Sequence, residues 1–478
     1  MQYSMQKKRN LDQPISFHKQ AGISSLLFIV LVGLSLTVLT VGYMSSMRNL
    51  QSSATTAHAQ TQAQMKAMMG YQALADFLKG QSIENVQKIK DGTIEGGGQI
   101  IHYERVVCPS GSAASLYCFD IKGVSGGASA IIRSNFNIID ELETKSQSGS
   151  VFAGGLRVNK LEDLSAKGIT LEVAGGIINK NNNHVYGQSE LSTAGITVIP
   201  YKPKDFIKPE DARKDANYIF YLEDNVAKCA INNIFDSTTI PNKRIEIETE
   251  LGNAGSTPCP SSVTYNGSVW TVDGSSGNLA GMLWFEGDVV VNLSKDINFK
   301  NTVISTQKIK TELLDEKKDS LYEAFAPHHF ILTADTTTLK NERLHQICPD
   351  NYPLQYCESK GILKSTALMQ QMPAIMANIL FLAQTIELSA GKEKQHNIVA
   401  NYYGNIIANG AAGGTGSASG KFTGTGVLNI RGNLMVVGEA DMTNMLGDFS
   451  MKLSNADSAG NYIPVYKKVI TIGGIRYM

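Results

Sequence analysis

The chain has 478 residues and a formal net charge of zero, from 43 basic and 43 acidic side chains. This length is sufficient for two or three domains with a sizeable buried core. The balanced charge provides no overall basic field, so we expect no nucleic-acid partner. The 44 glycines, with short runs of Val, Ile and Leu between turn residues, favour a β-rich body.

One uncharged segment without proline, residues 23–43, dominates the amino-terminal part of the chain. A helix needs about 20 apolar residues to cross a bilayer, so this segment is long enough. Basic residues precede it at Lys7, Lys8, Arg9 and Lys19, which predicts a cytoplasmic amino terminus and an exported body. The alternative is a cleaved secretory signal, but that would have an apolar region of about 7–15 residues with a small-x-small cleavage site close behind.

We expect the helix to continue past the membrane segment, to residue 79. No proline interrupts residues 23–79, and the strong helix formers Ala, Gln and Met are frequent in the second half. At 1.5 Å per residue this helix would be about 85 Å long. Apolar and small residues at helical spacing predict that its second half packs on a globular domain. The residues on this face are Ala63, Ala67, Gly70, Leu74 and Phe77.

The segment His18-Lys19-Gln20-Ala21-Gly22, followed by the apolar run and the amphipathic half-helix, resembles the start of the type IV pilin superfamily. The resemblance is closest to the PilX-type minor pilins, whose starts read Gln-x-Gly before small and aliphatic residues. In that superfamily a prepilin peptidase cuts after the glycine. The resemblance therefore implies a leader peptide at 1–22, cleavage after Gly22, a mature start at Ile23 and a pilin helix at 23–80.

One position departs from the pattern of major pilins. Their fifth mature residue is a glutamate that pairs with the amino-terminal charge of the subunit ahead, and the resemblance places Leu27 at that position. A carboxylate in the membrane is costly unless it is paired, so its absence favours a subunit with no neighbour ahead of it, at a tip or in a priming complex. PilX-type pilins and the pseudopilin at secretion-system tips share this absence.

The six cysteines form three pairs of near neighbours in the sequence. Their even number, without Cys-x-x-Cys or histidines at ligand spacing, indicates disulfides rather than zinc and hence an oxidising compartment. Six cysteines allow fifteen connectivities, of which we expect neighbour pairing. Free thiols in a cytosolic protein are the alternative, which conflicts with the membrane segment. The expected pairs are Cys108/Cys118, Cys229/Cys259 and Cys348/Cys357.

The remainder of the chain predicts an α+β fold class with a large β-rich body. Residues 81–150 are expected to be a transition region with a disulfide loop. From residue 151 to 478 a Gly-aliphatic-x-aliphatic pattern recurs, for example at 155–158, 287–291 and 432–436. Short alternating strands separated by Gly and Asn are typical of a parallel β-solenoid, and a hairpin-built β-sandwich is the alternative.

Two insertions are expected to interrupt this body, at about 201–264 and 308–364. The second should contain a short helix at 313–325. The apolar stretch 375–386 is too short to cross a membrane, so we interpret it as buried rungs, with a core helix as the alternative.

Motifs for catalysis are weak throughout. His328, His329 and His345 have no carboxylate or cysteine at diagnostic spacing, and adjacent histidines on a strand would point to opposite faces. Asp288 and Asp296 are the nearest candidates for the paired carboxylates of a solenoid glycosidase or lyase. We therefore expect no enzyme, no metal and no cofactor.

Taken with the resemblance, these features predict a minor pilin of a type IV pilus that acts in assembly or priming, or at the tip, where it could serve in adhesion. The implied partners are other major and minor pilins, the inner-membrane assembly machinery, the membrane itself and a host or surface ligand. The implied location is the bacterial inner membrane, with a periplasmic body, and then the extracellular pilus. The alternatives are a type II secretion pseudopilin, a membrane-anchored β-solenoid adhesin outside any filament, and a solenoid carbohydrate-active enzyme.

Overall fold

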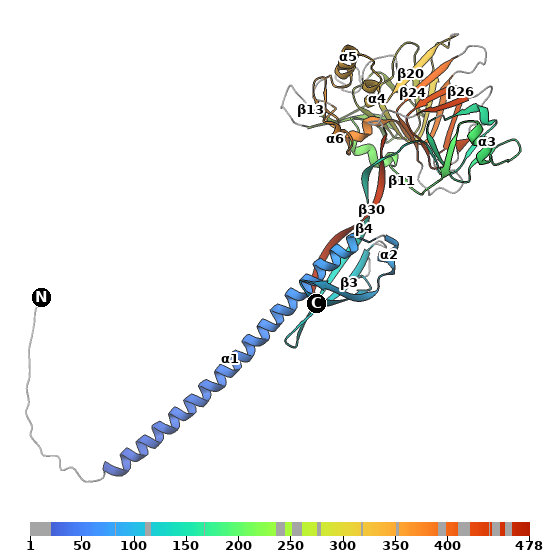
Figure 1. Ribbon diagram of the computed structural model, residues 1–478. Helices are drawn as coiled ribbons and strands as arrows, with labels where there is room; N and C mark the ends of the chain where they lie inside the picture. Colours follow the sequence, from blue (N-terminus) through green and yellow to red (C-terminus); the bar gives the residue numbers. More distant parts are fainter. Residues whose placement is uncertain are drawn as a thin grey trace, which may run out of the picture. The chain divides into compact units, whose positions relative to one another are not determined.

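The computed structural model divides into two units, which are described separately (Figure 1). Unit 1 comprises Met1–Ile139 and Lys468–Met478, and unit 2 comprises Asp140–Lys467. The structure describes residues 21–81, 83–109, 116–166, 168–235, 244–250, 261–274, 279–316, 319–349, 353–390, 398–409, 421–438, 440–441, 450–454 and 461–478.

Helix α1 of unit 1 spans Ala21–Lys79, which confirms the predicted continuous helix (Figure 1). It ends at Gly80, whose backbone N–H donates to the carbonyls of Asp76 and Phe77. The short helix α2 (Ile83–Lys88) follows. Glycine is a common helix stop because it has no Cβ and leaves the backbone free to turn.

An antiparallel sheet forms the rest of unit 1, in the order β1-β2-β3-β4-β30; β4 continues into unit 2 beyond Ile139, and β30 enters unit 1 at Lys468. Strands β1 to β4 pair as successive hairpins in the region expected to follow the helix. The carboxyl-terminal strand completes the sheet beside β4. The strands are β1 (Asp91–Gly96), β2 (Gln99–Val106), β3 (Leu116–Ser125), β4 (Ala128–Ser146) and β30 (Tyr462–Tyr477).

The second half of α1 packs directly on this sheet because the contact residues are small. Ala63 and Ala67 are fully buried. A Cβ at Gly123 of β3 would lie 2.1 Å from the Ala63 carbonyl oxygen and 2.5 Å from the Ala67 nitrogen. A Cβ at Gly70 would lie 2.4 Å from the Ile101 Cγ2 atom. A methyl group therefore fits at neither glycine, because it would meet the α1 backbone at Gly123 and the Ile101 side chain at Gly70.

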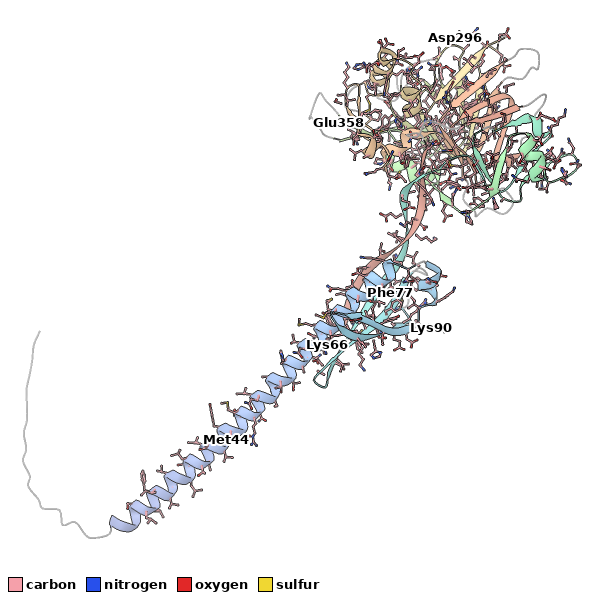
Figure 2. The ribbon with its side chains drawn as sticks, viewed as in Figure 1. Met44, Lys66, Phe77, Lys90, Asp296 and Glu358 are labelled. Carbon is pink, nitrogen blue, oxygen red and sulfur yellow. A yellow bond between two sulfur atoms is a disulfide. The ribbon has the colours of Figure 1, made fainter. Side chains whose placement is uncertain are left out.

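The predicted buried face of α1 is confirmed at four of its five positions and wrong at the last. Leu74 is fully buried, whereas Phe77 is 40% exposed and Leu78 is buried in its place. Figure 2 shows the labelled Phe77 and Lys66 along this half of the helix. Leu74 and Leu78 are four residues apart, one helical turn, and both join the apolar cluster that contains Phe119 of β3.

Unit 2 consists mainly of parallel strands arranged in three ladders. The first ladder contains, in spatial order, β12 (Tyr218–Glu223), β17 (Met282–Phe285), β19 (Thr302–Leu313), β23 (Ile379–Ala390), β25 (Asn405–Ala408), β27 (Leu434–Val436), β5 (Val151–Phe152), β8 (Thr170–Val173) and β10 (Thr197–Pro200). The second contains β16 (Trp270–Asp273), β18 (Val289–Leu293), the second halves of β19 and β23, β26 (Lys421–Arg431), β28 (Ala440–Asp441), β6 (Leu156–Val158) and β9 (Ile177–Asn179). The third contains β20 (Leu321–Phe325), β24 (Val399–Tyr403), the second half of β26, β29 (Ser450–Ser454) and β7 (Leu164–Ser165).

The remaining strands and helices of unit 2 lie outside these three parallel ladders. The antiparallel strands are β11 (Asp205–Phe206), β13 (Val226–Phe235), β14 (Arg244–Glu250), β15 (Val263–Tyr265), β21 (Cys357–Ser359) and β22 (Ile362–Leu363). The helices are α3 (Gln188–Thr193), α4 (Pro327–Leu332), α5 (Thr337–Ile347) and α6 (Thr366–Met369), with 3-10 turns η1 (Leu161–Asp163), η2 (Pro209–Asp215) and η3 (Ala374–Asn378).

Several boundaries differ from the sequence-based prediction. The range 313–325 is not a helix: it contains the end of β19 and all of β20, with turn residues Asp315 and Asp319 at positive φ between them. Strands β12, β19 and β20 belong to the parallel ladders, so the interruptions are narrower than 201–264 and 308–364. Residues 375–386 combine a buried 3-10 turn with a buried strand, close to the expected buried rungs.

Asparagine and glycine columns align successive ladder strands. Asn378, Asn405 and Asn433 are fully buried. The Asn433 backbone N–H and side-chain amide both donate to Asn405 Oδ1 at 3.1 Å, and the Gly149 N–H donates to Asn433 Oδ1 at 3.0 Å. Gly432 has φ +150, and a Cβ there would lie 2.3 Å from the carbonyl oxygen of Gly404. Asn405 and Asn433 thus satisfy buried backbone groups where the chain turns between strands.

The close approach of α1 to its sheet predicts that Gly123→Ala is destabilising. The added methyl must displace backbone atoms, and overpacking of this kind typically costs about 1–3 kcal/mol. Thermal unfolding of the full-length protein in detergent, with hydrogen–deuterium exchange of β2 and β3, measures the effect. Gly474→Ala is the matched control, since nothing lies within 4 Å of its Cβ position and its φ is ordinary. Equal stability of the two variants would contradict the packing argument.

The asparagine column predicts that Asn433→Ala lowers the stability of unit 2 by about 1–3 kcal/mol, because buried donors and acceptors lose their partners. Denaturant unfolding followed by tryptophan fluorescence reports on this unit, since both tryptophans, Trp270 and Trp284, lie in it. Asn429→Ala is the control: the half-buried Asn429 amide donates to Asn401 Oδ1 at 2.9 Å. We expect this control to cost about half as much or less, and the reverse order would refute the role of the column.

Candidate functional site

The first half of α1 exposes a continuous apolar surface. The helix from Ser25 is long and apolar enough to cross a membrane, by length and composition. Its large apolar side chains between Leu26 and Leu50 are 40% to 71% exposed in the single chain, and Figure 2 labels Met44 among them. This surface includes Leu26, Leu27, Phe28, Ile29, Val30, Leu31, Val32, Leu34, Leu36, Val38, Leu39, Val41, Tyr43, Met44, Met47 and Leu50. A soluble monomer rarely exposes such a surface, so it is a candidate membrane anchor and helix-packing face.

The hydroxyl groups within this segment are satisfied by the helix itself. Ser35 Oγ donates to the carbonyls of Leu31 and Val32 at 2.9 Å, and Thr37 Oγ1 donates to the Gly33 carbonyl at 2.5 Å. Such bonds to the preceding turn remove the need for water, which is scarce in a bilayer.

The residues implied by the pilin resemblance lie at the start of α1. Gly22 and Ile23 lie in its first turn, and the leader residues 1–20 are outside the described part of the chain. Leu27 is 63% exposed, and the first turn carries no acidic residue. The helix places Leu27 on the apolar surface, where its side chain is free to contact lipid or another helix.

Two disulfides are present among the described residues, each between sequence neighbours. Cys108–Cys118 links the end of β2 to β3, with a Cα–Cα distance of 5.3 Å. Cys348–Cys357 links the end of α5 to β21, with a Cα–Cα distance of 5.7 Å. Cys229 is also disulfide-bonded, and Cys259 lies outside the described residues.

The adjacent histidines lie on α4 rather than on a strand, so the expectation of opposite strand faces is wrong. Both are buried. His328 Nδ1 lies 2.6 Å from Asn378 Oδ1, whereas neither ring nitrogen of His329 has a hydrogen-bond partner among the described residues. Burial lowers the pKa of His329 to about 3. His329 is therefore a neutral core residue, and within the described ranges no cluster of His, Cys, Asp or Glu could hold a metal ion.

The two aspartates considered for glycosidase chemistry have different surroundings. Asp288 contributes its backbone carbonyl to the Trp270 N–H at 3.0 Å. Asp296 is exposed at a turn with φ +61 and lines a cavity of about 370 Å³ in unit 2. The described part of the chain therefore gives these two residues no shared site.

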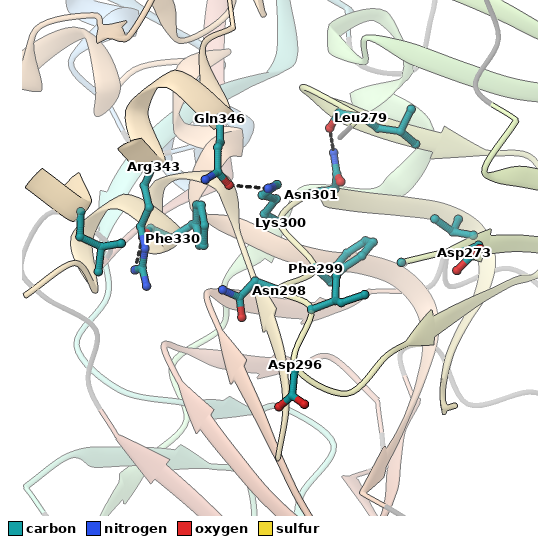
Figure 3. A pocket seen from close by; sticks show the side chains of 14 residues that line it. Asp273, Leu279, Asp296, Asn298, Phe299, Lys300, Asn301, Phe330, Arg343 and Gln346 are labelled. Carbon is teal, nitrogen blue, oxygen red and sulfur yellow. Dashed lines mark hydrogen bonds between the residues drawn. The ribbon is translucent and has the colours of Figure 1, made fainter. Parts of the chain in front are cut away.

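This cavity lies between the ladder strands and the α4–α5 helices (Figure 3). Its basic residues are Lys300 and Arg343, which both contact the Phe330 ring: Lys300 Nζ lies 5.3 Å and Arg343 Cζ 4.5 Å from the ring centroid. Lys300 Nζ donates to Gln346 Oε1 at 2.6 Å. No sequence motif indicated this pair, because Lys300 and Arg343 come from distant segments that only the fold brings together.

No family model matches the chain, and no curated protein matches it. Among solved structures, it is similar to the crystal structure of the competence-associated pilin ComZ from Thermus thermophilus, at 10% sequence identity and a TM-score of 0.25. The match covers 88% of this chain and 98% of that chain. A similarity of this strength carries no weight in the proposals below, which rest on the residues and geometry of this chain.

The burial of His329 predicts a stability that falls as the solution is acidified. The folded pKa of about 3 lies below the ordinary value of 6.5, so between these values the unfolded chain binds more protons and stability is lost as pH falls. From pH 7 to pH 5 the loss from this residue should be about 1–2 kcal/mol. Denaturant unfolding at both pH values measures it, and His329→Leu should remove this part of the pH dependence.

His184→Gln is the control for this experiment, since His184 is exposed and pairs with Glu190 at 3.0 Å. It should leave the loss assigned to His329 in place. A His329→Leu variant that loses as much stability on acidification as the parent protein would show that His329 does not titrate as argued.

Proposed function

We propose that the chain is a type IV pilin-like protein, a minor pilin that acts in filament assembly or priming, or at the tip. The observation that carries this proposal is the construction of α1. One half exposes an apolar surface long enough for a membrane, and the other half packs through Ala63, Ala67 and Gly70 on an antiparallel sheet of the same chain. Such a helix can sit in a bilayer before assembly and among other apolar helices afterwards.

The sequence His18-Lys19-Gln20-Ala21-Gly22 before the apolar run, through its resemblance to the type IV pilin superfamily, is the support for a processed amino terminus. The proposal places cleavage after Gly22, leaving Ile23 as the first mature residue, with the leader on the cytoplasmic side. Leu27 then stands where a subunit in the filament body would carry a paired glutamate. Without that carboxylate the subunit has no acceptor for a neighbour's amine, which favours a terminal or priming position.

We further propose that unit 2 is a parallel β-solenoid with insertions. Its support is the three parallel ladders and the columns of buried asparagine and stacked glycine. A hairpin-built β-sandwich would require antiparallel neighbours instead. The body would be periplasmic before assembly and would act by recognition and packing rather than by catalysis. Adhesion to a host or other surface ligand is the role that a tip position would give it.

The proposed partners are other major and minor pilins and the inner-membrane assembly machinery. The secretion-system pseudopilin remains the second candidate, since its helix would also lack the glutamate. A membrane-anchored adhesin outside any filament would carry the same body on an uncleaved helix. These alternatives differ in processing and in the phenotype of a strain that lacks the protein.

Amino-terminal sequencing of the mature protein tests the proposal directly. We expect a start at Ile23 in the parent protein and an uncleaved leader in Gly22→Val, because a branched side chain replaces the small residue at the cut. Gly33→Ala is the control: nothing lies within 4 Å of a Cβ there, so processing should be unchanged. A start at Met1 or near Gln60 would refute the pilin assignment.

A deletion strain then separates the filament systems. Loss of surface pili with normal protein secretion would support the pilus, and loss of secretion alone would identify the pseudopilin. Immunogold labelling that decorates filaments along their whole length would contradict a terminal position.

A further inference from the structure

We propose that the cavity between the ladder strands and helices α4 and α5 binds a sugar acid, a hydroxylated ring that carries a carboxylate. Its volume of about 370 Å³ falls within the range of small-ligand sites. All its described lining residues belong to unit 2. The inference does not depend on processing or on membership of a filament.

Lys300 and Arg343 make one side of the cavity cationic, which favours an anionic group on the ligand. Neither Lys300 nor Arg343 forms an ion pair with a carboxylate of the described residues. Lys300 is partly buried, and desolvation lowers its pKa. A partly desolvated cation without a counter-ion is unfavourable, and an anionic ligand group would relieve that cost.

Arg343 is held in place yet retains free donor capacity. Its Nη1 donates to the Phe330 carbonyl at 2.6 Å and to Thr333 Oγ1 at 2.8 Å. Its Nε is buried and has no hydrogen-bond partner within the described part of the chain. The Phe330 ring lies close to both this guanidinium and the Lys300 ammonium group. These contacts fix two positive groups around one wall of the cavity, and a carboxylate can accept from both.

The other side of the cavity is lined by carboxylate groups, which accept hydrogen bonds, and by an asparagine amide. Asp296 and Asn298 line it from the turn that precedes Lys300, and Asp273 lines it from β16; Figure 3 labels all three. The side chains of Asp296 and Asn298 form no hydrogen bond to another described residue. The Asp296 carboxylate accepts from hydroxyl groups but repels a second anionic charge. A ligand with one carboxylate and several hydroxyls matches both sides, whereas an inorganic dianion matches only the cationic side.

Titration of the oxidised full-length protein in detergent with D-glucuronate and D-galacturonate, followed by calorimetry or saturation-transfer NMR, tests the site. We expect one of the two to bind at least about tenfold more tightly than D-glucose, which lacks the carboxylate, and than inorganic phosphate or sulfate, which lack the hydroxylated ring. Arg343→Met and Lys300→Met should each weaken binding of the sugar acid by about tenfold or more. Asp296→Asn and Asn298→Ala should weaken it without weakening binding of phosphate.

Arg213→Met is the matched control, because Arg213 also lies over an aromatic ring of unit 2, 5.4 Å from the centroid of Trp284, but lies outside this cavity. It should bind the sugar acid like the parent protein. Thermal unfolding establishes that each variant is folded, and the exposed Asp296→Asn keeps the test available if Arg343→Met does not fold. Equal binding of phosphate and sugar acid would assign the cavity to inorganic anions and overturn the proposal. Absence of binding by both sugar acids, or binding unaffected by all four cavity variants, would also overturn it.

Discussion

Unit 1 is built around helix α1, whose apolar side chains must be buried along its whole length. The two halves of the helix need different partners for this burial. In its second half the partner is the sheet, and close contact requires Gly123, where the two backbones meet, and Gly70, where the helix meets the Ile101 side chain. In its first half the side chains from Leu26 to Leu50 find no partner among the described residues of this chain. The sheet thus anchors the helix by close packing and leaves the apolar half to be covered by lipid or by other helices.

Unit 2 is subject to a different constraint. The turns between its parallel strands carry buried backbone N–H and C=O groups that need hydrogen-bond partners. The buried Asn405 and Asn433 side chains satisfy these groups from one strand to the next, and Gly404 and Gly432 let the turns stack. A regular frame of this kind tolerates long insertions at its turns. Helices α4 and α5 are such an insertion, and they bring Arg343 close to Lys300. The cavity therefore lies between an insertion and the strands of the ladders.

The sequence alone was sufficient to predict elements that depend on residues close together in the chain, such as a helix. The apolar run and the alanine-rich continuation gave the extent of α1, and helical spacing identified the buried Ala63, Ala67 and Leu74. The range 313–325 is not a helix because its apolar residues belong to two strands, β19 and β20, whose partners lie in distant segments of the chain. Which strands pair, and that Lys300 meets Arg343, depends on contacts between distant segments, which a single sequence does not display.

The order of strands in space has a consequence for how the protein reaches its native state. Strands β5, β6 and β7 near the start of unit 2 pair with β27, β28 and β29 near its end, across almost 300 residues. The sheet of unit 1 is likewise completed by β30, the last strand of the chain. Neither unit can close until the carboxyl terminus has been delivered, and contacts this distant in sequence form slowly. A chain of this design must therefore stay unaggregated as an open intermediate until β27–β30 are available for pairing, and loss of β30 would compromise both units together.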